Sequence, residues 1–247
     1  REQTRLHAPE FTMLEWYRAN EPYDAVIEDT LTLIRLAADT AGIEHFHFRD
    51  TQCDPRAPAE RLTVAQAFTI HAGIDLLATL SPQGEGDRDM LSRKAQRSGL
   101  DVAENDNWAD IFSKVLVARI EPKLGRGKPT VLTEYPRCEA ALARATAHDP
   151  RVSERFEVYA SGVELANGFG ELTDAAEQRL RFEAEMDEKQ RVYGERYPLD
   201  EDFLAALAQM PPASGVALGF DRLAMLATGA RKLYDVLWTP LHNSNAD

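Results

Sequence analysis

Two glutamates and an asparagine fall in one stretch most of whose other residues have the apolar character of a buried strand. The stretch covers residues 164–174, and its polar members include Glu164, Asn167 and Glu171. A charge in such a place needs a partner, because moving an unpaired carboxylate out of water is costly. Carboxylates can hold Mg²⁺ on nucleotide phosphates or pair with the ammonium group of a ligand. For either glutamate taken alone, the alternative is a solvated position at a strand edge.

A second stretch, residues 214–222, brings small residues and an arginine to a predicted strand-to-helix turn. Gly215 and Gly219 would let a ligand approach the backbone, and Arg222 follows at the start of the helix. An arginine there can bind phosphate with its forked donors, with help from the helix dipole. Taken alone, the pattern is more typical of an ordinary turn with a surface arginine.

A third stretch lies at the beginning of the chain. Residues 10–18 mix aromatic and polar side chains in alternation, which predicts a strand with one chemically active face and places Glu10, Thr12 and Tyr17 near that strand. Basic residues come just before it. The spacing of these residues names no function by itself.

The rest of the pattern predicts the elements that position these three stretches. Apolar residues recur at helical spacing over 24–41 and stop at Gly42, which is typical of a glycine-capped helix. Ser161-Gly162 suits a hairpin turn between two strands. The remaining strands are predicted at 130–136, 155–159 and 163–169, and the remaining helices at about 174–193 and 200–210 and after Gly219 through Leu226.

The order of these elements favours one α+β domain over residues 1–247. Strands follow one another with few helices between them, which indicates an antiparallel or mixed sheet flanked by helices. Residues 81–129 are typical of a helical insertion, because breakers at 81–86 precede two predicted helices, around 87–98 and 107–120.

Charge and composition narrow the classes of function. The chain has 247 residues and a formal net charge of −13, which argues against the broad cationic surface that non-specific nucleic-acid binding requires. Its two cysteines are too few for a disulfide framework, and no apolar run reaches membrane-spanning length. The beginning of the chain lacks a signal-peptide pattern. We therefore expect a protein of the reducing cytoplasm.

Taken together and in this order, the three stretches resemble the class II lysyl-tRNA synthetase group. Residues 5–15 are similar to the end of that class's motif 2, 164–174 to the lysine branch's Glu-Leu-x-Asn-x-x-x-Glu-Leu signature, and 215–222 to motif 3. The resemblance implies a class II synthetase-like sheet. Motif 1 and the start of motif 2 would precede Arg1, so we expect the chain to hold the larger, C-terminal part of the catalytic domain.

Within this group the sequence is most similar to the ligases that modify elongation factor P. That resemblance implies an enzyme that uses ATP to form a lysyl-type adenylate and transfers an (R)-β-lysyl group to a lysine of elongation factor P, without tRNA. It also implies a homodimer when complete. Ala217 stands where tRNA synthetases of the group generally carry glycine, and one added methyl group can shift preference from α-lysine toward a β-amino acid.

The resemblance also implies roles for individual residues. Arg222 and Glu164 would be catalytic, with Arg222 on the phosphates. The residues implied in ATP binding are Glu164, Leu165, Gly219 and Arg222, and those implied in amino-acid binding are Tyr17, Glu171 and Ala217. Mg²⁺ would assist, with Glu164 as the first candidate ligand and Glu171 as the second.

Two alternatives stay open at this point. The chain could be the catalytic fragment of a lysyl-tRNA synthetase, although Ala217 and the acidic composition argue against it. It could also be a non-catalytic paralogue that acts as a binding subunit. Ala8 motivates the second alternative, because the family has an ATP-facing asparagine there and alanine cannot replace its hydrogen bonds.

Overall fold

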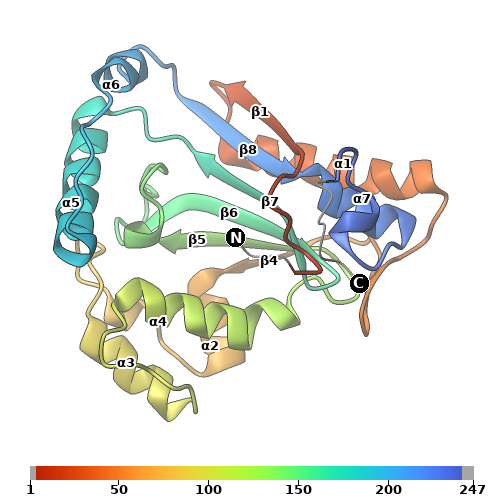
Figure 1. Ribbon diagram of the computed structural model, residues 1–247, viewed down its shortest axis with the longest axis horizontal. Helices are drawn as coiled ribbons and strands as arrows, with labels where there is room; N and C mark the ends of the chain where they lie inside the picture. Colours follow the sequence, from red (N-terminus) through yellow and green to blue (C-terminus); the bar gives the residue numbers. More distant parts are fainter. Residues whose placement is uncertain (1–3, 241–247) are drawn as a thin grey trace.

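A six-stranded sheet forms the centre of the protein (Figure 1). The computed structural model describes residues 4–240. In space the strands run in the order β1-β8-β7-β6-β5-β4, and all neighbours are antiparallel except the parallel pair β4 and β5. The strands are β1 (Met13–Ala19), β4 (Glu60–Thr63), β5 (Thr130–Pro136), β6 (Val152–Ala160), β7 (Val163–Gly170) and β8 (Ala213–Gly219). A separate hairpin is formed by β2 (Phe46–Phe48) and β3 (Thr51–Cys53).

Helices α1 (Tyr23–Ala41) and α7 (Phe220–Thr228) cover one face of the sheet. The buried side of α1, which includes Val26, Ile27 and Ile34, packs with buried residues of β6, β7, β8 and α7 in one apolar core. As predicted, α1 ends at Gly42, whose φ of 68° lies in the left-handed region that glycine adopts without strain. The opposite face of the same strands is left for polar side chains.

A second apolar cluster lies beyond β5, beside the other end of the sheet. It joins α2 (Val64–Ala72), α3 (Arg88–Arg97) and α4 (Trp108–Val115) to Leu132, Tyr135 and Tyr159. Thr63 caps α2 through a reciprocal capping box with Gln66. The two helices predicted within 81–129 are present, and a helical segment at 116–123 follows α4. That 81–129 is an insertion stays a prediction.

The hairpin of β6 and β7 carries several charged side chains and has an irregular register. Ser161 and Gly162 form its two-residue turn with φ values of 52° and 73°, the conformation preferred in tight hairpins. Glu157 pairs with Asn167, but Tyr159 pairs with Glu164, so one extra residue is accommodated in β7. This bulge turns Glu164 and Asn167 toward the same face, although a spacing of three would separate them in a regular strand.

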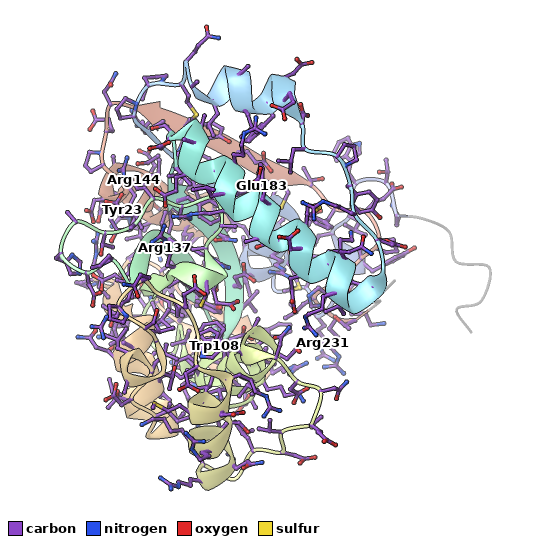
Figure 2. The ribbon with its side chains drawn as sticks, turned by 90° about the vertical axis from the view of Figure 1, so that its left-hand side faces the viewer. Tyr23, Trp108, Arg137, Arg144, Glu183 and Arg231 are labelled. Carbon is purple, nitrogen blue, oxygen red and sulfur yellow. The ribbon has the colours of Figure 1, made fainter. Side chains whose placement is uncertain are left out.

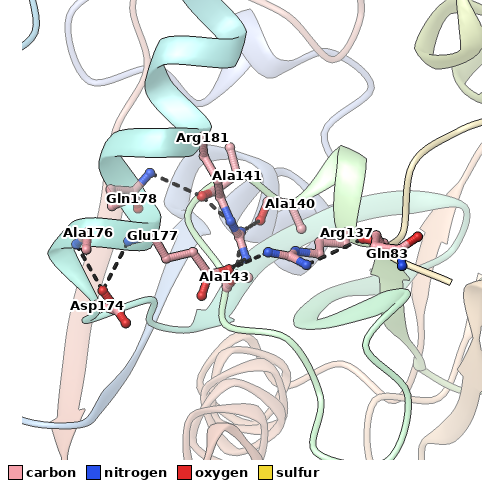
Figure 3. A network of polar contacts seen from close by, with 10 residues as sticks. All are labelled: Gln83, Arg137, Ala140, Ala141, Ala143, Asp174, Ala176, Glu177, Gln178 and Arg181. Atoms are coloured by element: carbon pink, nitrogen blue, oxygen red, sulfur yellow. Dashed lines mark hydrogen bonds and ion pairs between the residues drawn. The ribbon is translucent and has the colours of Figure 1, made fainter. Parts of the chain in front are cut away.

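Helix α5 (Ala175–Tyr193), with α6 (Glu201–Leu207) after it, stands at the edge of the molecule and faces the viewer in Figure 2. Its first turns are fastened to the segment 137–143. Glu177 accepts from Arg137 at 2.7 Å and from Arg181 at 2.6 Å, and Arg181 donates to the carbonyls of Ala140, Ala141 and Ala143 (Figure 3). Ala143 forms a β-bridge with Glu171, so this clamp reaches the end of β7.

The predicted fold class is confirmed: the sheet is mixed and mostly antiparallel, and helices flank it. Three boundaries differ by three residues. The first strand begins at Met13 rather than at Glu10, β6 begins at Val152 rather than at residue 155, and α6 ends at Leu207 before the predicted end.

Candidate active site

The larger of two adjoining cavities, of about 280 Å³, opens where β7 and β8 meet the start of α7. Residues 6–8 and 11–13 of the N-terminal segment close one side of it, and 164–167 of β7 close another. Ala217, Gly219, Asp221 and Arg222 complete the lining together with Leu233. Ala8 is buried in this wall.

Arg222 lies in the first turn of α7 and reaches across to β7. Its Nη1 donates to the carbonyl oxygen of Glu164 at 3.0 Å and lies 3.3 Å from Glu164 Oε2. The preceding residue, Asp221, is only 3% exposed and accepts from the backbone N–H of Thr12 at 2.6 Å, which joins α7 to the N-terminal segment. A fixed guanidinium and a helix N-terminus therefore face one cavity, an arrangement that suits phosphate groups.

Glu164 belongs to a group of acids that repel one another. Burial and the neighbouring Glu157 raise its pKa, while Arg222 opposes the rise. Burial also raises the pKa of Glu121 to about 7, with further contributions from Glu157 and Glu164. Glu157 is 6% exposed and accepts from the Tyr159 hydroxyl at 2.6 Å. A bound cation would relieve this repulsion, because it favours the ionised form of each acid.

A smaller cavity, of about 190 Å³, lies beside the first and contains Tyr17 and Glu171. A Cβ at Gly215 would come within 2.5 Å of both Glu171 Oε1 and Tyr17 Cε1, so the two side chains close over this glycine. Burial raises the pKa of Glu171 to about 7, and the only opposing influence is the positive charge of Arg144. Among the described residues, Glu171 has no ion-pair partner within 4 Å. Its carboxylate is therefore suited to a cationic ligand.

The two cavities share Asn167 and Ala217. Strand pairing explains why: Glu157, Asn167, Ala217 and Glu15 form one row across β6, β7, β8 and β1. The next row on the same face contains Arg155, Phe169, Gly215 and Tyr17. Two neighbouring rows of side chains thus build a continuous site.

The structure places each predicted site residue in one of these cavities. The larger cavity contains Glu164, Leu165, Gly219 and Arg222, the smaller contains Tyr17 and Glu171, and Ala217 lines both. It does not bring together the two predicted magnesium ligands, because Glu164 and Glu171 line different cavities and the acid beside Glu164 is Glu157. Among residues 4–240 no three acids, histidines or cysteines are grouped as a metal site. The sequence interpretation missed Glu157 and assigned no role to Asn167.

Comparisons with known proteins show which family the chain matches. Residues 1–243 match the family model described as tRNA synthetases class II (D, K and N). A protein of Proteus mirabilis named "Elongation factor P--(R)-beta-lysine ligase" is 39% identical over 98% of this chain and 69% of its own length. Proteins of the same name from Sodalis glossinidius and Pectobacterium atrosepticum are each 41% identical over 96% of this chain and 66% of their length. The chain thus spans about two thirds of the relatives it matches.

None of the helices in the described part of the chain has the length and apolar character needed to cross a bilayer. With the ordered motifs, the mixed sheet and the family match over nearly all its residues, the chain belongs to the class II tRNA synthetases of the D, K and N group.

Proposed function

We propose that this protein is an ATP-dependent ligase that forms a lysyl-type adenylate and transfers an (R)-β-lysyl group to a lysine of elongation factor P. The observation that carries the proposal is the pair of adjoining cavities, one with a fixed cation and one with a partly buried acid, that share Asn167 and Ala217. The relatives' names support this choice of reaction over the two alternatives, and the family supports an ATP-dependent amino-acid ligase.

In this proposal ATP occupies the larger cavity. Arg222 neutralises phosphate charge, Gly219 leaves room for the nucleoside next to Leu165, and Glu164 holds Arg222 in place through two contacts. Alignment and charge neutralisation are what adenylate formation requires, since the substrate carboxylate itself attacks the α-phosphorus and pyrophosphate departs.

The amino acid occupies the smaller cavity. Its distal ammonium group pairs with Glu171, and Tyr17 packs beside it over Gly215. The carboxylate then points toward Asn167 and Ala217, where the two cavities meet. The size of the side chain at 217 therefore acts at the position where α- and β-amino acids differ.

Mg²⁺ fits the larger cavity through Glu164, and Glu157 is a better second ligand than Glu171. Glu157 raises the pKa of Glu164 and is itself buried, and oxygen ligands are what Mg²⁺ prefers. When bound, the ion would neutralise charge on the phosphates.

The acceptor and the assembly complete the proposal. The amine of a lysine on elongation factor P attacks the activated carbonyl, and AMP leaves. The net charge of −13 suits a protein acceptor better than the phosphate backbone of tRNA. We place the enzyme in the cytoplasm as a homodimer, because it would modify a translation factor there and the resembled family is dimeric.

Amino-acid-dependent ATP–pyrophosphate exchange tests the proposal, using the protein expressed from its complete gene. Exchange with (R)-β-lysine in preference to α-lysine, followed by transfer to elongation factor P, is the expected result. Preference for α-lysine with charging of tRNA would favour the synthetase fragment. Absence of both ATP binding and exchange would favour the non-catalytic paralogue suggested by Ala8.

A further inference from the structure

Arg155 lies beside the junction of the two cavities and contacts two polar side chains there. Its Nε donates to Asn167 Oδ1 at 3.3 Å, and its Nη2 donates to Glu157 Oε1 at 2.7 Å. Arg155 pairs with Phe169 in the β6–β7 register, so it occupies the row next to Glu157 and Asn167 on the same face of the sheet. Its side chain is 20% exposed.

The guanidinium group is held from several sides. Its Nη1 donates to the carbonyl oxygen of Glu139 at 2.5 Å, and its central carbon lies 4.2 Å from the ring centroid of Tyr135 and 5.9 Å from that of Phe169. A planar cation that is stacked and hydrogen-bonded in this way loses most of its rotational freedom. Arg155 is thus a rigid reference point for the groups it contacts.

This contact determines which end of the Asn167 amide faces the cavities. A guanidinium group only donates hydrogen bonds, so the partner of Arg155 Nε must be the amide oxygen. The opposite end of the amide, Nδ2 with its two N–H donors, then faces the cavities that Asn167 lines. The carboxylate oxygens of a substrate have only lone pairs, so they need hydrogen-bond donors where the two cavities meet.

We propose that Arg155 is a positioning residue that fixes the Asn167 amide with its N–H donors toward the substrate carboxyl group. The inference rests on the proposed function, because it needs a carboxyl group at the junction of the cavities. Glu157 anchors the other side of the guanidinium and keeps it in register with Asn167. Arg155 therefore acts through Asn167 and does not touch the substrate.

A double-mutant cycle tests this assignment. Arg155→Lys keeps a positive charge beside Glu157 but removes the forked donors, and Asn167→Ala removes the amide. We expect each single substitution to lower the rate of amino-acid-dependent exchange about 10- to 100-fold. In the Asn167→Ala background, adding Arg155→Lys should lower the rate by less than about threefold. ATP affinity measured without amino acid should stay within about twofold. Arg18→Lys is the matched control, since Arg18 pairs with Asp29 on the helical side of the sheet.

The outcomes separate this inference from the proposed function. If the unmodified protein exchanges with no amino acid, the proposed function fails. If it is active and Arg155→Lys costs the same factor with and without the Asn167 amide, or costs nothing, the positioning role is wrong. Should Arg155→Lys not fold, Asn167→Asp decides, because aspartate still accepts from Arg155 but has no N–H donors. A folded Asn167→Asp protein that retains exchange would overturn the inference, and one that loses it supports the inference.

Discussion

The two cavities lie side by side on one face of the sheet, but they hold charge in different ways. In the larger cavity Arg222 contacts both the carbonyl and the carboxylate of Glu164, so its positive charge already has a partner. In the smaller cavity burial raises the pKa of Glu171 to about 7, and no described residue forms an ion pair with it. In one cavity the cation already has an acidic partner before a ligand binds, and the described lining of the other includes no cation.

This difference shows which ligand each cavity suits. A phosphate can take over donors of Arg222 while Glu164 stays close by, so binding there rearranges an existing ion pair. An ammonium group gives Glu171 a partner that the fold does not supply. A buried acid without a partner reduces stability, and proteins retain such groups where a ligand uses them.

The largest expected effect comes from removing the fixed cation of the larger cavity. Arg222→Ala should lower the rate of ATP–pyrophosphate exchange about 10³-fold, since one preorganised donor to a developing charge is worth about 10²- to 10³-fold and this side chain also binds ATP. Arg222→Lys keeps the positive charge but not the forked donors, and it should lower the exchange rate by a smaller factor. If Arg222→Ala raises the KM of the amino acid and leaves the KM of ATP unchanged, the assignment of ATP to the larger cavity is wrong.

In the smaller cavity, Glu171→Gln removes the charge and keeps the shape of the side chain. We expect the KM of the amino acid to rise about 10- to 100-fold, because a hydrogen bond to a charged group contributes about 1.5–3 kcal/mol. The KM of ATP should change little. Steady-state kinetics with each substrate varied in turn checks this, and an equal rise in both KM values would contradict a separate amino-acid cavity.

The raised pKa of Glu171 predicts that amino-acid binding in the smaller cavity depends on pH. The ionised form binds the ammonium group, so the apparent affinity for the amino acid should be constant above about pH 7 and fall about tenfold per unit below it. The same shift reduces stability. The native state binds more protons than the unfolded chain between about pH 4.5 and 7, so this acid lowers the free energy of unfolding as pH rises through that range.

Glu171→Gln should remove both effects together. The slope of amino-acid affinity below pH 7 should disappear, and the variant should unfold at a higher temperature than the unmodified protein at pH 8. Thermal unfolding at pH 5 and pH 8 measures the second effect. A variant that is less stable than the parent at pH 8 would show that Glu171 has a stabilising partner after all.

The sequence predicted several of the residues that line the two cavities, but not Asn167 and not how the acids are paired. Gly42 and the turn Ser161-Gly162 act locally, through backbone conformation, so their patterns could be recognised directly. The association of Glu164 with Glu157 depends on a bulge in β7 that no local pattern reveals.

A signal for Glu157 was present in the sequence. It is an acid between the apolar residues Phe156 and Val158 of a predicted strand, and the burial argument used for Glu164 applies to it equally. Asn167 is different, because only the row across β6, β7, β8 and β1 shows that it joins the two cavities.

The smallest expected effect is at Ala217, which lines both cavities. Ala217→Gly removes one methyl group where the carboxyl end of the amino acid meets ATP, and we expect the ratio of kcat/KM for (R)-β-lysine over α-lysine to fall about tenfold. Ala217 pairs with Asn167 and Glu15 within the sheet, so glycine there also costs some stability. Leu218 pairs in the same strands but faces the core, and Leu218→Val serves as a control for that cost. A change in both substrates by the same factor would mean that the methyl group supports the strand and does not select the substrate, and the two cavities would then meet without a selective residue between them.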